Sequence, residues 1–367
     1  MTKNVAIFVN SAWGAFNFRL NLARYLKNNG HSVFFIFPPD QIYTKEILKE
    51  FDYSPLEFNR GGLNPFYEIF TCYKLWIILK RKRPDLILNF TVKPNIYGSI
   101  IGRLLQIDSI NNVTGLGTAF IDNKILSLLV KRLYKYSLSL SKHTFFQNLD
   151  DEKLFKDNDL VLKNRFSLIP GSGVDIQKFS PVDSCDSNLI NFLMVGRLIR
   201  DKGIFEYIEA AKEVKKKFCN VEFGILGPID DKSRNSIDFD FIKRVEEKGI
   251  VKYFGSTDDV KKFLSKTNCV ILPSYREGSP RSIMEASAMQ IPVLASNVPG
   301  CRQVVKNGVT GFLFEKKNSK DLVRKIEKFI SLTDSQKRRM GIEGRKKMLK
   351  EFDESFIFRL YDDIISK

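Results

Sequence analysis

The sequence predicts an α/β fold with two parallel-sheet domains, and three observations lead to this prediction. Hydrophobic runs of about four to eight residues alternate with longer amphipathic stretches, which is typical of a parallel sheet covered by helices. The alternation occurs twice, before and after a polar segment near Pro170–Asp175. The 367 residues are enough for two domains of ordinary size, each with its own core.

The strand candidates of the first series run through the N-terminal half of the chain. They are Val5–Asn10, Ser32–Pro39, Asp85–Phe90, Ser109–Val113 and Thr144–Asn148. The amphipathic stretches between them predict helices. One of these, Asn17–Asn29, is followed by Gly30, which suits a helix C-terminus because glycine adopts left-handed backbone angles without strain.

The second series begins after a linker that is rich in glycine, proline and serine and extends from Ile169 to Ser187. Its strand candidates are Asn191–Gly196, Val221–Leu226, Val251–Phe254, Cys269–Pro273 and Pro292–Ser296. We therefore expect an N-terminal domain of residues 1–172 and a second domain of residues 173–351. Ligands of open α/β sheets bind outside the carboxyl ends of the strands, so we expect a binding cleft between the domains.

The composition is that of a globular protein, with 43% hydrophobic and 28% charged residues. No apolar run approaches the roughly 18 residues needed to span a bilayer, and the N-terminus lacks a secretory signal, so we expect a cytoplasmic location. The cysteines are scattered without a C-x-x-C pair, which favours reduced core thiols over a metal site or a disulfide framework. They are Cys72, Cys185, Cys219, Cys269 and Cys301.

The formal net charge of +17 is shared by both halves of the chain, which excludes a basic tail as its source. Such a charge suits a nucleic-acid surface, an anionic membrane surface or binding of phosphorylated small molecules, and composition alone does not choose among them. No helix-turn-helix, zinc or RNP-type signature accompanies the charge, which weighs against the nucleic-acid alternative.

A first candidate site follows the strand that ends near Gly196. Arg197, Arg200 and Lys202 come directly after it, before a helix expected to begin near Gly203. Glycine lets the backbone approach an anion, and two or three cations beside it would clamp a diphosphate. The same residues also fit a solvated basic turn.

A second candidate site follows the strand that ends near Pro273. A Gly-Ser-Pro loop leads into a helix that Pro280 is suited to open, with Glu277 before that helix and Glu285 inside it. The free amides of the helix N-terminus favour a phosphate, and a carboxylate beside them can accept hydrogen bonds from sugar hydroxyls. Alternatively, Glu277 is a helix cap and Glu285 an exposed charge. The apolar surroundings of Glu285 predict burial, and hence a partner for its charge.

Taken together, four motifs in this order resemble glycosyltransferase family 4, and the resemblance extends over nearly the whole chain. The motifs are the Gly196–Gly203 segment, the pair Glu277-x7-Glu285, the hinge Pro170–Asp175 with Phe179–Pro181, and Gly308–Phe314. The resemblance implies a GT-B fold, with two facing Rossmann-like domains and a cleft between them. It also implies sugar transfer with retention, without a metal or other cofactor, and a C-terminal helix (352–367) that crosses back to the N-terminal domain.

The resemblance also assigns roles to residues of the C-terminal domain. It implies that Arg197 and Lys202 bind the donor diphosphate, that Glu277 contacts hydroxyls of the donor sugar, and that Glu285 binds the ribose. Further donor contacts are implied for Gly278, Ser279 and Pro280, around the sugar and phosphate, and for Phe254 and Gly255, near the base. Side-chain cations would then replace a metal on the leaving group.

In the N-terminal domain, Gly14 matches the family's glycine-containing loop near the phosphates, although a plain turn explains it equally well. Two segments, beginning at Asn89 and Asn112, resemble a bacterial subgroup that builds O-antigen, capsule or lipid-linked oligosaccharides from UDP-sugars. The donor sugar expected from it is a HexNAc or hexuronic acid, and the acceptor a polyprenyl-diphosphate-linked saccharide. The acceptor-side candidates are Lys93, Asn95, Thr114 and Gly115.

One departure concerns histidine. Many family members carry a histidine where this chain reads Leu88–Thr91, and the only histidines here are His31 and His143, both expected to be structural. A front-face retaining mechanism does without a histidine base, because the departing phosphate oxygen can take the acceptor proton. The shortage of acid and base groups also weighs against the alternative of a UDP-sugar epimerase on the same fold.

Two segments combine aromatic or leucine residues with lysine and arginine, Phe66–Arg83 and Lys124–Lys142. Such segments suit the headgroup region of an anionic bilayer, and they equally suit helices with a basic outer face. A polyprenyl-linked acceptor favours the first interpretation. We therefore expect a peripheral position on the inner face of the cytoplasmic membrane.

Overall fold

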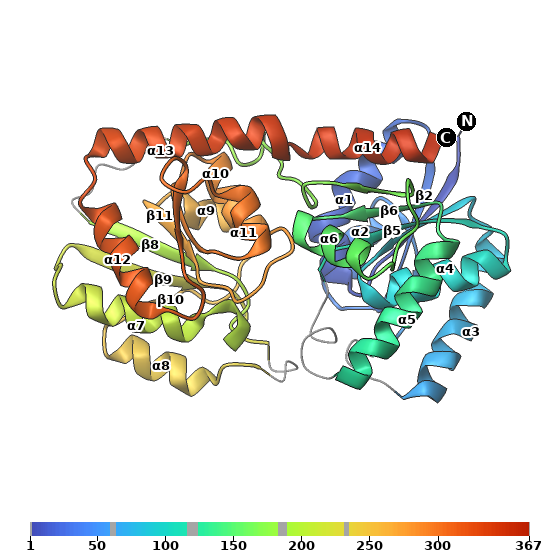
Figure 1. Cartoon of the computed structure of the whole chain (residues 1–367), viewed down its shortest axis with the longest axis horizontal. Helices are drawn as coiled ribbons and strands as arrows, with labels where there is room; N and C mark the ends of the chain where they lie inside the picture. Colours follow the sequence, from blue (N-terminus) through green and yellow to red (C-terminus); the bar gives the residue numbers. More distant parts are fainter. Residues whose placement is uncertain (1, 59–63, 116–123, 183–188, 231–234, 367) are drawn as a thin grey trace. The chain divides into compact units, whose positions relative to one another are not determined.

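The computed structural model describes residues 2–58, 64–115, 124–182, 189–230 and 235–366, apart from the side chains of residues 124–127. The chain divides into two compact units. The first consists of Met1–Ser172 together with Phe356–Lys367, and the second of Gly173–Ser355. Figure 1 shows that each unit is a sheet with helices on its faces.

Among the described residues, the first unit contains a seven-stranded parallel sheet in the order β3-β2-β1-β4-β5-β6-β7. Its strands are β1 (Asn4–Phe8), β2 (Ser32–Phe37), β3 (Asp52–Pro55), β4 (Leu86–Phe90), β5 (Asp108–Val113), β6 (His143–Phe146) and β7 (Phe166–Leu168). Its helices are α1 (Ala12–Asn28), α2 (Tyr43–Leu48), α3 (Pro65–Lys82), α4 (Val92–Leu104), α5 (Lys124–Leu140), α6 (Leu149–Asp157) and α14 (Glu354–Ser366).

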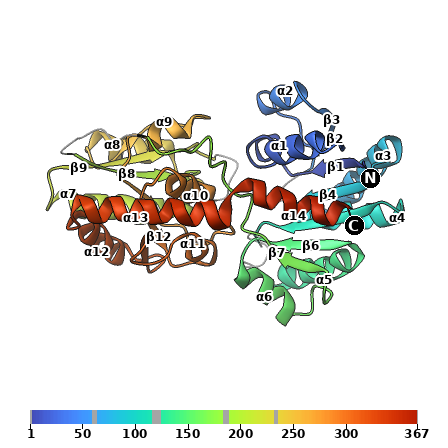
Figure 2. The same ribbon diagram turned by 90° about the horizontal axis from the view of Figure 1, so that it is seen from above.

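The two faces of this sheet receive alternate residues of each strand, as a pleated strand requires. In β1, Val5 and Ile7 join the core beneath α1 and α14, whereas Ala6 and Phe8 join the core beneath α3. Helix α14, formed by the last residues of the chain, contributes Tyr361 to the first of these cores and lies along that face of the sheet (Figure 2).

Local chemistry sets the ends of α1. The Ser11 side chain accepts a hydrogen bond from the Gly14 amide and caps the N-terminus. At the other end, Gly30 has a φ of 89°, its amide donates to the Lys27 carbonyl, and the next amide donates to the Leu26 carbonyl. These two bonds satisfy carbonyls that the helix leaves open, and they are possible because glycine tolerates positive φ.

In the second unit, the described residues form a six-stranded parallel sheet in the order β10-β9-β8-β11-β12-β13. Its strands are β8 (Ile190–Val195), β9 (Val221–Leu226), β10 (Lys252–Tyr253), β11 (Cys269–Leu272), β12 (Val293–Ser296) and β13 (Gly311–Phe314). Its helices are η2 (Arg200–Lys202), α7 (Ile204–Lys215), α8 (Phe239–Glu247), α9 (Val260–Leu264), α10 (Arg281–Ala288), α11 (Pro299–Val304), α12 (Ser319–Ile330), α13 (Asp334–Lys347) and η3 (Met348–Phe352).

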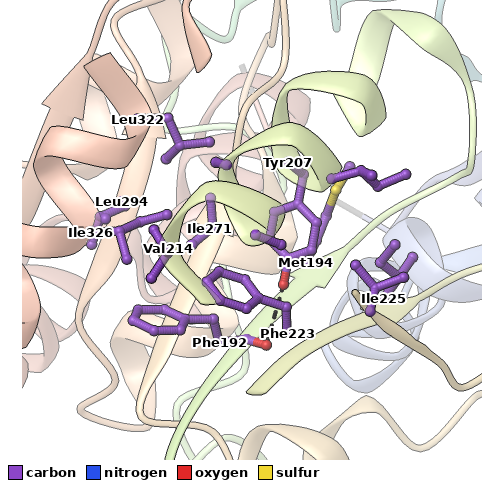
Figure 3. Packing of buried hydrophobic residues seen from close by; sticks show 14 of the residues in the cluster. Phe192, Met194, Tyr207, Val214, Phe223, Ile225, Ile271, Leu294, Leu322 and Ile326 are labelled. Atoms are coloured by element: carbon purple, nitrogen blue, oxygen red, sulfur yellow. Dashed lines mark hydrogen bonds between the residues drawn. The ribbon is translucent and has the colours of Figure 1, made fainter. Parts of the chain in front are cut away.

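The larger core of the second unit lies between this sheet and helices α7 and α12. Phe192 and Met194 of β8 enter it together with Tyr207 of α7 (Figure 3), whereas Leu193 points into the core on the opposite face. The Tyr207 hydroxyl donates to the backbone carbonyl of Gly224 at 2.8 Å. Satisfying this hydroxyl allows a large aromatic side chain to be fully buried.

In both sheets the strand order reverses between two neighbouring strands, β1 and β4 in the first unit and β8 and β11 in the second. Helices leave in different directions on the two sides of such a reversal, and the carboxyl ends of the strands there form the usual ligand site of an open α/β sheet. The topology therefore singles out the loops that follow these four strands.

Several strand predictions differ from the structure. All ten predicted strands are present with ends shifted by up to two residues, but β3, β7 and β13 were missed. β3 and β7 are short edge strands, and β13 pairs only with β12, so little of their sequence carries the pattern of a buried strand.

The expectation of core thiols was wrong for Cys219, which is exposed, and for Cys72, which is half-buried. Cys269 and Cys301 are buried, and Cys185 lies outside the described residues. The C-terminal helix begins at Glu354 and not at Phe352, because Met348–Phe352 form a π-helical turn.

Candidate active site

Two loops meet at the carboxyl ends of β8 and β11, which are adjacent parallel strands. The Tyr275 amide donates to the Asp201 carbonyl at 2.8 Å, which joins the loop after β11 to the loop after β8. Gly203 has a φ of 75°, and a Cβ atom there would lie 2.1 Å from the carbonyl oxygen of Pro273. Only glycine allows both this backbone angle and this approach.

The Lys202 ammonium and the Glu277 carboxylate form an ion pair across these two loops. Their side chains are 22% and 10% exposed, so the pair is largely shielded from water. Shielding strengthens the attraction between the charges and raises the cost of removing one partner. The structure thus brings together two of the three predicted catalytic residues.

The third, Arg197, lies at the same end of β8 but has a different partner. Its Nη1 donates to Asp230 Oδ2 at 2.7 Å, and half of the side chain is exposed. An exposed ion pair of this kind contributes little to stability and exchanges readily with an incoming anion. Arg197 is therefore available to a ligand at modest cost.

The Gly278–Pro280 loop is fixed from the side of α11. The Gly300 amide donates to the Glu277 carbonyl at 3.2 Å, and a Cβ atom on Gly300 would lie 2.4 Å from the Gly278 carbonyl oxygen. Ser279 directs its hydroxyl toward the Met284 sulfur at 3.8 Å. Pro280 is the N-cap of α10, with helical residues starting at Arg281, so the prediction that it occupies the first helical turn was off by one residue.

Glu285 of α10 is buried, as predicted, and its charge has a partner that the sequence did not identify: Arg281, whose Nε donates to Glu285 Oε1 at 3.1 Å. Burial raises the pKa of the Glu285 carboxyl, and the cations of Arg281 and Lys178 oppose that rise. The carboxylate is thus kept in a poorly hydrated place, where an additional hydrogen-bond donor would stabilise its charged form.

Phe254 and Gly255 lie just beyond β10. The Gly227 amide donates to the Gly255 carbonyl at 2.8 Å, which links the loops after β9 and β10. Phe254 packs against Gly224, where a Cβ atom would lie 2.6 Å from its ring, and 37% of the residue remains exposed. An aromatic side chain that is part exposed at the carboxyl end of a strand can contact a planar ring.

Sequence reasoning missed the support of this site by Tyr275. The Tyr275 hydroxyl donates to the Glu206 carboxylate at 2.8 Å, and the Lys317 ammonium lies 4.7 Å from the ring centre. Burial, together with the bond to Glu206, raises the pKa of Tyr275. Tyr275 lies inside the second predicted motif, but no sequence signal connects it to Glu206, 69 residues away.

In the first unit, the acceptor-side candidates have different surroundings. Lys93 is ion-paired with Glu68 of α3, and both side chains are mostly buried. Asn95 is fully buried, and both ends of its amide bond the backbone of Asn112, so it supports the site from within and is not open to a ligand. Thr114 and Gly115 follow β5 and are partly exposed. The remainder of the family-like segment that begins at Asn112, which runs to Gly117, lies outside the described residues.

Three other predicted residues of the first unit have structural contacts. Gly14 lies in the first turn of α1, where its amide donates to the N-cap residue Ser11, and a Cβ atom there would lie 2.8 Å from Ser11 Oγ. His31 accepts from the Lys3 amide at 3.2 Å, and His143 bonds the Ser167 hydroxyl at 2.8 Å. Both histidines thus have hydrogen-bond partners within the first unit, which agrees with the structural role expected of them.

In the described part of the chain, no helix is long and apolar enough to cross a membrane. The same residues contain no group of three or more His, Cys, Asp or Glu side chains arranged as metal ligands.

Two parallel-sheet α/β units are the architecture of the GT-B fold, which is found in sugar-transferring enzymes. Residues 4–148 match the family model "Glycosyl transferase 4-like", and residues 176–347 match "Glycosyl transferases group 1". The two models together cover most of the chain, which is therefore a glycosyltransferase with one domain of each kind.

Relatives and solved structures agree with this assignment. The chain is 28% identical, over 95% of its length and 96% of the other, to the N,N'-diacetylbacillosaminyl-diphospho-undecaprenol alpha-1,3-N-acetylgalactosaminyltransferase of Campylobacter jejuni. It is 25% identical, over 80% and 77%, to the UDP-Gal:alpha-D-GlcNAc-diphosphoundecaprenol alpha-1,3-galactosyltransferase of Escherichia coli. The fold matches that of the Anabaena protein HepE, solved with UDP and glucose, with a TM-score of 0.79, 16% identity and full coverage of both chains.

Proposed function

We propose that this glycosyltransferase moves a sugar, a HexNAc or a hexuronic acid, from a UDP-sugar to a polyprenyl-diphosphate-linked saccharide, with retention and without a metal. The observation that carries the proposal is the Lys202–Glu277 pair at the strand reversal of the second unit. A cation and a carboxylate held together there suit a ligand that has both a diphosphate and sugar hydroxyls.

The choice of substrates is supported by the names of two relatives. The Campylobacter jejuni and Escherichia coli enzymes both act on sugars linked to undecaprenol through a diphosphate. The second also has UDP-Gal in its name. A donor activated by UDP and an acceptor on a polyprenyl diphosphate are the simplest substrates consistent with these similarities, and they would place the enzyme in the synthesis of a surface glycan.

In this proposal the donor diphosphate replaces carboxylates as the partner of two cations. Lys202 turns from Glu277 to the phosphates, and Arg197 turns from Asp230. Both stabilise the negative charge that develops on the departing UDP, which is the task a metal performs in other transferases. Glu277, released from Lys202, accepts hydrogen bonds from hydroxyls of the donor sugar.

Glu285 binds the ribose in the same proposal. Its buried carboxylate has a raised pKa, and two ribose hydroxyls supply the donors that burial has removed. Phe254 and Gly255 contact the uracil ring. The acceptor hydroxyl gives its proton to the phosphate oxygen that leaves on the same face of the sugar, so no histidine is needed.

The acceptor lipid requires access to a membrane, and α3 offers a face for it. Phe66, Phe70, Tyr73 and Ile77 recur on one side of this helix and are 81%, 52%, 55% and 42% exposed. Helix α5 adds exposed Leu128, Leu129, Leu133 and Tyr136.

Cations accompany this surface of α3. The Lys74 ammonium lies 4.6 Å from the Phe70 ring centre and the Lys80 ammonium 4.6 Å from that of Trp76, and the helix ends in Arg81 and Lys82. Exposed aromatic residues beside lysine and arginine fit the headgroup region of an anionic bilayer. We assign the exposed face of α3 to the inner leaflet of the cytoplasmic membrane.

Calorimetric titration with UDP, in the presence of EDTA and with ADP and GDP as controls, tests the donor. Selective UDP binding that Arg197→Ala weakens is the expected result, and preference for another nucleotide would overturn the donor. Incubation with labelled UDP-sugars and a polyprenyl-diphosphate disaccharide then tests transfer. A labelled lipid product is expected; UDP with an epimerised free sugar nucleotide, or steeply salt-dependent DNA binding without transfer, would replace the proposal by one of the two rivals.

A further inference from the structure

Asn112, the fifth residue of β5, is fully buried and uses every polar group that it has. In its side chain, Nδ2 donates to the Asn89 carbonyl at 3.0 Å, and Oδ1 accepts from the Tyr361 hydroxyl. Its backbone amide donates to Asn95 Oδ1 at 3.1 Å, and its carbonyl accepts from Asn95 Nδ2 at 2.9 Å. These four bonds fix the position of Asn112.

The network joins the ends of two strands to the start of a helix. Asn89 lies in β4, Asn112 in β5 and Asn95 in the first turn of α4. Thr91, between β4 and α4, has a φ of 79°, which a β-branched residue rarely adopts. Its amide donates to the Asn112 carbonyl at 3.4 Å, and its carbonyl accepts from the Asn95 amide at 3.0 Å. The asparagines therefore hold this unusual backbone in place.

The partner of Asn112 Oδ1 comes from the far end of the chain. Tyr361 belongs to α14, is 1% exposed, and packs its ring edge-on against Phe145 of β6 with centroids 4.8 Å apart. The ring and the hydroxyl have separable roles. The ring fills the core beneath α14, and the hydroxyl satisfies an amide oxygen that would otherwise be buried without a partner.

We propose that the Tyr361 hydroxyl is a positioning group for the acceptor: through Asn112 and Asn95 it sets the two segments that leave the sheet after β4 and β5. The first of these carries Lys93, and the second continues into Thr114 and Gly115. Tyr361 touches no substrate. Its effect is on the geometry of residues 91–95 and 112–115, so it acts on acceptor binding and not on donor binding. The kinetic part of this inference rests on the proposed function.

Tyr361→Phe tests the inference, because it keeps the ring and removes only the hydroxyl. Tyr207→Phe is the matched control, since Tyr207 is an equally buried tyrosine of the second unit. Its hydroxyl also bonds the protein interior, with the carbonyl of Phe192 at 3.2 Å (Figure 3) and that of Gly224 at 2.8 Å. For Tyr361→Phe we expect the KM for a polyprenyl-diphosphate disaccharide to rise about tenfold, because the segments that carry Lys93, Thr114 and Gly115 are no longer held in the geometry that binds the acceptor. UDP affinity should stay unchanged, and the control should leave the acceptor KM unchanged.

Hydrogen exchange gives a readout that needs no activity. In Tyr361→Phe, exchange should accelerate at the amides of Thr91, Asn95 and Asn112, with the central strands of the second unit unaffected. An unchanged exchange pattern, or equal changes throughout the first unit, would overturn the inference. So would an unchanged acceptor KM. If the wild-type enzyme transfers no sugar but exchange still accelerates at these three amides in the variant, the proposed function is contradicted. The positioning role of Tyr361 is then still supported.

Discussion

The Lys202 ammonium is ion-paired with the Glu277 carboxylate, although 75 positions separate them in the chain. Lys202 ends the short helix η2 after β8, and Glu277 lies in the loop after β11. The backbone contact between Gly203 and Pro273, and the bond from Tyr275 to Asp201, keep the two loops in register. Charge and backbone geometry thus build one site from two distant segments.

Glu277→Ala should reduce transfer by about a hundredfold or more, the scale of losing an electrostatic contact to the reacting group. UDP affinity should hold or rise, because Lys202 no longer has a carboxylate competitor. Initial rates and calorimetry measure the two effects. Glu327→Ala, which removes the partner of an exposed ion pair to Lys217, is the control and should behave as wild type. Normal kinetics in Glu277→Ala would reject the site.

Arg197→Ala and Asp230→Asn should change UDP affinity in opposite directions. The first removes a cation from the diphosphate, and a loss of about tenfold is expected for one charged contact. The second frees the Arg197 guanidinium from its carboxylate partner at 2.7 Å, so affinity should rise modestly. Titration of both variants with UDP at low and high salt checks this. Equal losses in the two variants would mean that the pair acts only as a structural unit.

Gly203→Ala should be far more damaging than Gly249→Ala. Both glycines have positive φ, 75° and 68°, so each substitution costs about 1–2 kcal/mol of backbone strain. Only at Gly203 would the new Cβ also lie 2.1 Å from a backbone carbonyl, that of Pro273, whereas nothing lies within 4 Å at Gly249. Denaturant unfolding should show the difference, and UDP affinity should fall in Gly203→Ala alone. Similar stability losses would refute the close contact between the loops.

Glu285→Gln should flatten part of the pH dependence of stability. The pKa of Glu285 is raised in the folded protein, so the folded state holds this proton to a higher pH than the unfolded chain does. Ionisation therefore opposes folding, and stability falls as pH rises from about 4.5 through the raised pKa. Urea unfolding across that range should show a smaller fall in Glu285→Gln.

The control for this experiment is Glu343, whose pKa is shifted in the opposite direction to that of Glu285. Lys346 lowers the pKa of Glu343, so this carboxylate loses its stabilising pairing only as pH falls below its ordinary value. Glu343→Gln should leave the dependence of stability on pH unchanged above pH about 4.5. A steeper fall in Glu285→Gln than in wild type would show that Arg281 outweighs burial at this position.

Replacing Phe70 and Tyr73 by serine should weaken sedimentation with vesicles that contain phosphatidylglycerol. Each side chain removed is more than half exposed, so the fold loses little. Phe239→Ser in the second unit, at 53% exposure, is matched to Phe70 at 52% and should leave vesicle binding unchanged. Transfer to a short-chain, water-soluble acceptor should also be unchanged in the α3 variant. Equal vesicle binding by all variants would contradict the proposal that α3 contacts the membrane.

Much of the fold follows from local patterns. The buried strands β1, β4, β8, β9 and β11 are nearly continuous hydrophobic runs, and helix ends are marked by local residues such as Ser11 and Gly30. β3 and β7 could not be predicted in the same way. They pair with only one neighbour each, and that pairing, not their own sequence, makes them strands.

The candidate site, too, could be predicted only in part. Residue types and spacing were enough to select Arg197, Lys202, Glu277 and Glu285, because diphosphates and sugars call for cations, carboxylates and glycine-bearing loops after strands. The contacts that hold the surroundings of the site in place could not be predicted from the sequence. Nothing near Tyr275 in the sequence points to Glu206, and nothing near Asn112 points to Tyr361.

The sequence by itself determined the class of fold, the glycosyltransferase assignment and the loops that carry the proposed donor residues, since these depend on hydrophobic period and on short motifs. Only the tertiary structure decided which charges meet. It pairs Lys202 with Glu277 and Lys93 with Glu68, and it turns Asn95 inward to Asn112. The physical reason is that strand order and helix packing bring distant residues within hydrogen-bond range, and periodicity along one segment carries no information about its neighbours in space.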